Sequence, residues 1–71
     1  MYILRINQRN INVVRECATV PEIAMTINEE LFHGLIIAKK STIYSLLTRP
    51  KTLPNIPWKN CIEITGSYVK N

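Results

Sequence analysis

Three side chains in this sequence could act as a nucleophile or as a base: Cys17, Cys61 and His33. A thiol beside an imidazole can carry out nucleophilic catalysis, because the imidazole takes up the thiol proton. Nothing in the spacing of the chain selects either cysteine as a partner of His33, and a single histidine is more often a surface residue than a base. The sequence therefore predicts that the protein is not an enzyme.

Metal, cofactor and disulfide chemistry find equally little support in the residue spacing. Cys17 and Cys61 stand far apart and form no Cys-x-x-Cys motif, and Gly34 and Gly66 are isolated, so neither a metal site nor a phosphate-binding loop is indicated. We expect no cofactor. A disulfide is conceivable in principle, but a reducing cytosol disfavours it, and both cysteines are expected to be small apolar residues.

The bulk composition indicates one small folded domain. The chain has 71 residues, 46% of them hydrophobic, so residues 1–71 are expected to form a single domain. The longest apolar run, Leu35 to Ala38, is expected to be a core segment and is far too short to span a membrane. The first ten residues carry charges where a signal peptide would be apolar, which predicts a cytoplasmic protein without membrane contact.

Charge is unevenly distributed along the chain. The net charge is +4, residues 16–30 carry acids and no base, and residues 31–62 carry no acid. The bases of the second segment are Lys39, Lys40, Arg49, Lys51 and Lys59. Such an arrangement favours a basic face that binds nucleic acid or an acidic protein.

Residues 39–54, KKSTIYSLLTRPKTLP, contain the most informative element. Ser41 is a natural N-cap, and a short helix is predicted from Thr42 to about Thr48 or Arg49, where Pro50 stops it. At 100° per residue, one face of this helix is apolar and the opposite face is rich in hydroxyl groups. The inner face contains Ile43, Leu46 and Leu47, and the outer face contains Ser41, Ser45 and Thr48 with Tyr44, Thr42 and Arg49 at its margins.

The remaining elements complete an α+β pattern. Residues 2–6 and 11–16 favour strands and suggest either an N-terminal hairpin or a single strand with a loop. Thr19, Pro21 and Glu22 predict a capped helix start. That helix is expected to run to about residue 27, and Asn28 is interpreted as the N-cap of another helix.

Near the C-terminus, residues 58–64 predict a hairpin with Lys59 and Asn60 at its turn, and Tyr68 and Val69 are candidates for a further strand. Trp58 has two interpretations. It is either a lid over the core or an exposed aromatic side chain at a binding edge.

These features leave two interpretations of the helix open. It is either a solvated amphipathic helix, which often ends in Lys or Arg, or a helix that binds double-stranded DNA. A short helix with small polar residues on its outer face can enter the major groove, while cations at its ends hold phosphates. A basic hairpin after it would reach the DNA backbone or the minor groove. The candidate DNA-binding residues are Lys39, Lys40, Ser41, Thr42, Tyr44, Ser45, Thr48, Arg49, Lys51, Trp58, Lys59 and Asn60.

The order TVPEIA, KKSTIYSLL, LPNI and WKNCIEI resembles the excisionase-like winged helix-turn-helix family of phages and mobile elements, which is related in fold to MerR regulators. This resemblance covers about residues 19–64. It implies two to three short helices, a recognition helix around 41–49 and a β-hairpin wing around 57–62. It also implies a role in recombination, with an integrase as a partner, or in transcription regulation. Some twelve additional residues, roughly 27 to 38, separate the two matching helices, and Ser45 stands where the family often has arginine.

A second hypothesis assigns the chain to a different functional class. A small phage-type inhibitor or interaction module would direct the same basic face at an acidic partner surface. The N-terminal strand would also be available to pair with another chain and form a homodimer. An exposed apolar patch would favour protein binding, whereas a polar, basic face would favour DNA.

Overall fold

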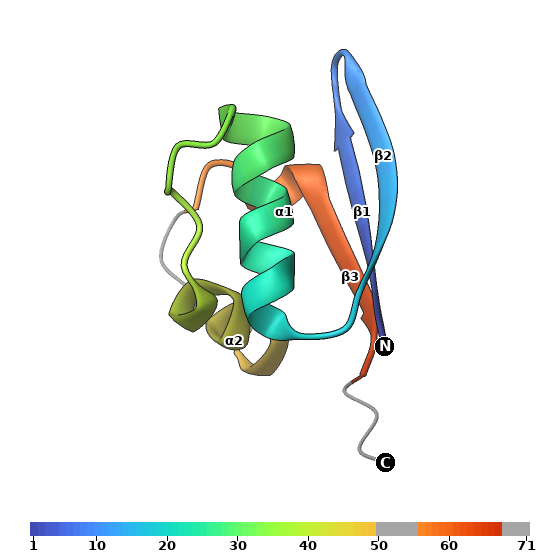
Figure 1. Ribbon diagram of the computed structural model, residues 1–71, viewed down its shortest axis with the longest axis vertical. Coiled ribbons are helices and arrows are strands. Elements are labelled where there is room, and N and C mark those ends of the chain that lie inside the picture. The colour runs from blue at the N-terminus through green and yellow to red at the C-terminus, as the bar shows by residue number, and fades with distance from the viewer. Residues whose placement is uncertain (50–55, 68–71) are drawn as a thin grey trace.

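The computed structural model describes residues 1–49 and 56–67, which form a three-stranded sheet with two helices on one side (Figure 1). The elements in chain order are β1 (Tyr2–Gln8), β2 (Ile11–Cys17), α1 (Val20–Phe32), α2 (Lys40–Thr48), the 3₁₀ helix η1 (Lys59–Cys61) and β3 (Ile62–Gly66). The strand candidates near the N-terminus are therefore confirmed as a hairpin, turning at residues 9 and 10.

The sheet has the order β2-β1-β3, and β1 pairs antiparallel with both neighbours. Leu4 lies opposite Ile64, and Ile6 lies opposite both Val13 and Ile62. Because side chains alternate between the two faces of a strand, these residues all point toward the helices. Leu4 and Ile6 are fully buried there, so β1 is the central strand of the sheet and of the core.

The predicted winged helix-turn-helix fold is wrong. The strand that the sequence placed in a C-terminal hairpin is β3, and it pairs with β1 at the start of the chain. Lys59 and Asn60 form the first turn of η1 instead of a hairpin turn. A two-stranded hairpin is only marginally stable by itself, whereas joining β1 buries the apolar side of β3 against the helices. The candidate strand at residues 68–69 and Pro50, which was expected to stop the helix, lie outside the described residues.

Helix α1 begins where the sequence predicts. The Thr19 side chain accepts a hydrogen bond from the Glu22 amide at 3.3 Å, and the Glu22 carboxylate accepts one from the Ala18 amide at 2.9 Å. The first bond satisfies an amide that has no partner within the first helical turn, and the second ties the residue before the N-cap to the same turn. The inner face of the helix consists of Val20, Ile23, Ala24 and Ile27, as the spacing of these residues predicts.

The second helix expected to begin at Asn28 does not exist as a separate element. Helix α1 continues through this residue to Phe32, and Asn28 is buried in its last half. The helix ends at His33, whose φ of 54° is left-handed, and Gly34 follows with a φ of 89°. Two successive residues with positive φ cannot continue a right-handed helix, so the chain leaves α1 at this point.

The core lies between the sheet and the two helices. Its fully buried large side chains are Leu4, Ile6, Ile23, Ile27 and Ile43. At its margin, Trp58 is half-buried and its ring meets Phe32 edge-on, with centroids 6.2 Å apart. This contact agrees with the interpretation of Trp58 as a lid over the core.

Candidate functional site

Helix α2 starts two residues earlier than the sequence predicts. Lys39 is its N-cap residue, and Lys40 is its first helical residue, so Ser41 is not the cap. No side chain caps this end. The prediction from Ser41 failed because a serine within the first turn also tolerates helical geometry, and the local sequence cannot fix the boundary to a single residue. The amino end of α2 thus combines uncapped amides with two adjacent lysines.

The two faces of α2 divide as the helical periodicity predicts. Ile43 is fully buried, and Leu46 and Leu47 pack against the core. On the opposite side, Ser41 and Thr48 are exposed. The helix is therefore fixed by its apolar residues and offers its hydroxyl groups to solvent.

The outer face of α2 is polar, with one aromatic side chain among its hydroxyl groups. Tyr44 is 52% exposed, while Thr42 and Ser45 are partly exposed. The Thr48 hydroxyl donates to the Tyr44 carbonyl oxygen at 2.8 Å, which fixes the orientation of the threonine while its oxygen can still accept. At the end of the helix, the Arg49 amide donates to the Ser45 carbonyl oxygen at 2.7 Å.

Cations stand at both ends of α2. Lys39 and Lys40 are exposed at its amino end, and Arg49 is exposed at its carboxyl end. Lys59, from η1, lines a hollow together with Leu46 and Leu47 and thus lies close to the same helix. Lys51 lies outside the described residues. Four of the five predicted cations therefore belong to α2 or to its immediate surroundings.

Two other candidate residues are placed differently. Trp58 contributes to the core margin, as described above. Asn60 is exposed and lines a hollow with Arg5, Asn7 and Val14, side chains of the sheet face opposite the helices. Asn60 therefore does not share a surface with the outer face of α2.

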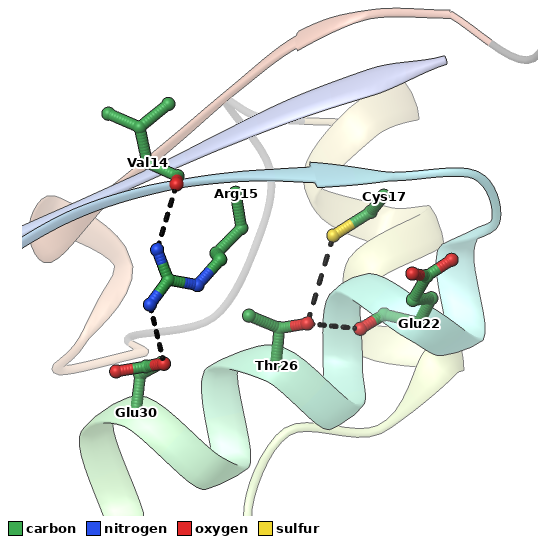
Figure 2. Close-up of polar contacts among 6 residues, drawn as sticks. All are labelled: Val14, Arg15, Cys17, Glu22, Thr26 and Glu30. Atoms are coloured by element: carbon green, nitrogen blue, oxygen red, sulfur yellow. Dashed lines mark hydrogen bonds and ion pairs between the residues drawn. The ribbon is translucent and has the colours of Figure 1, made fainter.

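The Cys17 thiol and the His33 imidazole are also separated. Cys17 is buried at the end of β2, with its sulfur 3.8 Å from the Thr26 hydroxyl oxygen (Figure 2). His33 caps the far end of α1, seven residues beyond Thr26, which corresponds to about 10 Å along the helix axis. The structure does not bring these two groups together.

Cys17 has an altered acidity. Burial raises the pKa of its thiol above the ordinary value, and the negative charge of Glu22 raises it further. The hydrogen bond with Thr26 acts on this pKa in the opposite direction. A thiol that is both buried and hard to deprotonate is a weak nucleophile.

Arg15 links β2 to α1. Its guanidinium group donates to the Val14 carbonyl oxygen at 3.1 Å and to the Glu30 carboxylate at 3.4 Å (Figure 2).

Sequence reasoning missed the most exposed apolar segment among residues 1–49 and 56–67. The run expected to be a core segment buries only Ala38, whereas Leu35 is 65%, Ile36 81% and Ile37 45% exposed. The prediction assumed that apolar residues are buried. The position of the run could have indicated an exposed loop, because His33 and Gly34 end a helix directly before these residues and two lysines follow Ala38.

The described residues provide no other chemical centre. Among residues 1–49 and 56–67, no three metal-ligating side chains lie together, and no helix has the length and apolarity needed to cross a membrane. Comparisons with protein-family models, curated proteins and solved structures gave no match to this chain.

Proposed function

We propose that this protein binds double-stranded DNA through the outer face of α2. The observation that carries the proposal is the division of this helix into an apolar inner face and a hydroxyl-rich outer face between Lys39, Lys40 and Arg49. No acidic side chain occurs on α2 or anywhere in residues 31–62. Phosphate groups would therefore meet cations without a repelling carboxylate from this part of the chain.

The dimensions of α2 suit a groove contact. A helix with its side chains is about 10–12 Å across, which fits the ~12 Å width of the major groove, and the nine residues of α2 give about 13 Å of length along it. Serine and threonine side chains are short, so the helix backbone can approach the base edges closely. Thr42 and Ser45 would form hydrogen bonds with bases or phosphates, and the Thr42 methyl group would contact a thymine methyl group.

The lysines at the amino end of α2 would hold the DNA backbone. Their charges stand beside the unpaired amides of the first helical turn, which carry partial positive charge. Arg49 would contact a phosphate at the other end of the helix. In this binding mode, α2 alone enters the groove, and the sheet and α1 support it from behind. No β-hairpin wing is required.

The test is fluorescence anisotropy of a labelled AT-rich duplex at increasing salt concentration. Each neutralised phosphate contributes about −0.9 to the slope of log affinity against log salt, so roughly four contacts predict a slope of about −3.6. The double variant Lys40→Ala/Arg49→Ala should weaken binding to every sequence alike and lower the magnitude of the slope by about 1.8. Thr42→Ala and Ser45→Ala should instead relax the preference among sequences.

A matched control separates the site from the net charge. The double variant Arg5→Ala/Arg9→Ala also removes two exposed cations, but from the opposite sheet face and from the β1–β2 turn. It should retain most of the affinity and the slope. Equal losses in both double variants, or no binding to the duplex at ~50 mM salt, would contradict the assignment to α2.

A further inference from the structure

Residues Leu35, Ile36 and Ile37 form an exposed apolar segment that the fold itself does not need. Ile36, 81% exposed, has the largest exposed fraction among the large hydrophobic residues of the described chain. Single exposed aliphatic residues are common, but three in succession form a contiguous apolar patch. Because the core closes around Ala38 and not around these side chains, polar residues could replace them without loss of packing.

The backbone of this segment is held in one conformation. The Leu35 amide donates to the Phe32 carbonyl oxygen at 3.0 Å, and the Ile37 amide lies 3.1 Å from the Leu35 carbonyl oxygen, which closes a three-residue turn centred on Ile36. The Asn28 side chain, buried in α1, accepts from the Ile37 amide at 3.0 Å and from the Ala38 amide at 2.7 Å. These bonds fix both ends of the turn and project Ile36 outward.

Because the Leu35–Ile37 turn is already held in one conformation, it would lose little conformational entropy on binding a partner. Ordering a flexible loop opposes association, whereas a segment already held in one conformation loses little freedom when it docks. A few side chains that fill pockets on the partner often carry most of the binding energy of a protein interface. Ile36, exposed at the centre of the Leu35–Ile37 turn, could fill such a pocket.

The charges beside the turn indicate the kind of partner. Lys39 and Lys40 follow directly and are exposed. A second copy docking through the same turn would bring these lysines toward their counterparts, and the repulsion between like charges would oppose a homodimer. Nucleic acid would gain nothing from the aliphatic side chains, because its backbone is charged.

We propose that Leu35, Ile36 and Ile37 form a preformed docking turn for a second protein, whose surface offers an apolar pocket with an acidic rim. The pocket accommodates Ile36, with Leu35 and Ile37 at its edges. The rim carboxylates face Lys39 and Lys40 and supply the attraction that orients the encounter. This contact is separate from DNA binding by α2, although the two share these lysines.

The test replaces Ile36 by the photo-crosslinking residue p-benzoylphenylalanine in the full chain, within the cells that produce it. The crosslinked protein is identified, and the crosslinked position is located in it. We expect an apolar surface flanked by Asp or Glu. The purified partner should then bind the wild-type chain, lose at least tenfold in affinity for Ile36→Ser, and lose about threefold for Lys39→Gln.

Val14→Thr is the matched control, because Val14 is also an exposed aliphatic residue, 48% exposed, but lies in β2. It should leave the affinity unchanged, and circular dichroism should show that both variants are folded. Ile36→Ser should also leave DNA affinity unchanged, whereas Arg49→Ala should reduce DNA affinity and leave the partner's affinity unchanged. The two proposals can therefore fail separately.

Four results would overturn the docking proposal. The first is the absence of a protein crosslink, and the second is a partner that binds Ile36→Ser as tightly as the wild type. The third is a crosslink to another copy of this chain, accompanied by a dimer in analytical ultracentrifugation. The fourth is co-sedimentation with vesicles of phosphatidylglycerol and phosphatidylcholine that Ile36→Ser abolishes, since this would assign the turn to a membrane surface.

Discussion

Asn28 satisfies both backbone polar groups of Ala38: its Nδ2 donates to the Ala38 carbonyl oxygen at 2.9 Å, and its Oδ1 accepts from the Ala38 amide at 2.7 Å. Asn28 is 7% exposed and Ala38 2%, so little water reaches this contact. Through these two residues, the last half of α1 fixes the chain just before α2. The contact therefore determines where α2 begins and holds the exposed turn in front of it.

Replacing Asn28 by alanine should destabilise the protein considerably. Three hydrogen bonds would be lost, and the Ala38 amide and carbonyl groups would stay buried without a partner. We expect a decrease of about 2–4 kcal/mol in the free energy of unfolding, since each unsatisfied buried group costs roughly 1–3 kcal/mol. Urea unfolding followed by circular dichroism measures it. Asn12→Ala, at an exposed position of β2, should change the value by less than about 0.5 kcal/mol, and equal losses would contradict this role.

Local signals explain which parts of the fold could be predicted. The start of α1 depends on Thr19 and Glu22, which lie three positions apart and bond to amides within five residues. The apolar faces of α1 and α2 follow from periodicity alone, and Ile43 is buried as its position predicts. The sequence contains this information because every interaction involved lies within about one helical turn.

The failures have the opposite origin. Asn28 has the residue type of an N-cap, but its partners in the structure are nine and ten residues away in a loop. Strand β3 pairs with β1 across nearly the whole chain, and no local pattern distinguishes that partner from a neighbouring hairpin strand. The apolar run before Lys39 was assigned to the core because burial was inferred from composition alone. Strand pairing across the chain, and the burial of a run that has no helical or strand periodicity, depend on the whole fold and cannot be predicted from residue type alone.

The two cysteines should differ in reactivity and should not form an internal disulfide. Cys17 is 1% exposed, whereas Cys61 is half-buried. Cys17 pairs with Tyr2, and the residue after Cys61 pairs with Ile6, so the two lie near opposite ends of β1. Four residues of strand span about 13 Å, well beyond the ~7 Å Cα separation that a disulfide tolerates.

Labelling of the native protein with a maleimide, followed by mass spectrometry, measures this difference. We expect modification of Cys61 at least tenfold faster than of Cys17, because access to sulfur limits the reaction. In urea, the two rates should become similar. Faster labelling of Cys17 in the native protein would show that the end of β2 opens readily.

The raised pKa of Cys17 predicts a loss of stability at alkaline pH. The folded protein binds the thiol proton more tightly than the unfolded chain, so this stabilisation is fully present below pH 9.0, the ordinary pKa of the thiol. The stabilisation is lost as the pH rises from there through the higher pKa of the folded state. Unfolding free energies between pH 8 and about 11 should therefore fall more steeply for the wild type than for Cys17→Ala.

The difference in slope between wild type and Cys17→Ala should approach, at most, about 1.4 kcal/mol per pH unit, the value for one proton. Below pH 8 the two curves should run parallel, because the thiol is protonated in both states. If the unfolding free energies of the wild type and of Cys17→Ala differed by the same amount at every pH, the variant would have lost only packing contacts. In that case the acidity of Cys17 would not be linked to folding.

Gly66 and Gly34 allow the cost of a steric contact to be separated from the cost of a backbone conformation. Both have a φ of 89°, which side chains disfavour. A Cβ atom at Gly34 would meet nothing within 4 Å, whereas one at Gly66 would collide with the Met1 carbonyl oxygen. Gly34→Ala should cost about 1–2 kcal/mol from strain alone, and Gly66→Ala about 3 kcal/mol or more.

The larger cost at Gly66 has a structural reason. Next to it, the Met1 amino group donates to the Ser67 carbonyl oxygen at 2.7 Å, and Tyr2 lies opposite Gly66 in the sheet. An added methyl group must push β1 and β3 apart where they meet, since the atom it strikes is backbone and cannot rotate away. Urea unfolding of both variants measures the difference, and equal costs would mean that this end of the sheet yields without resistance.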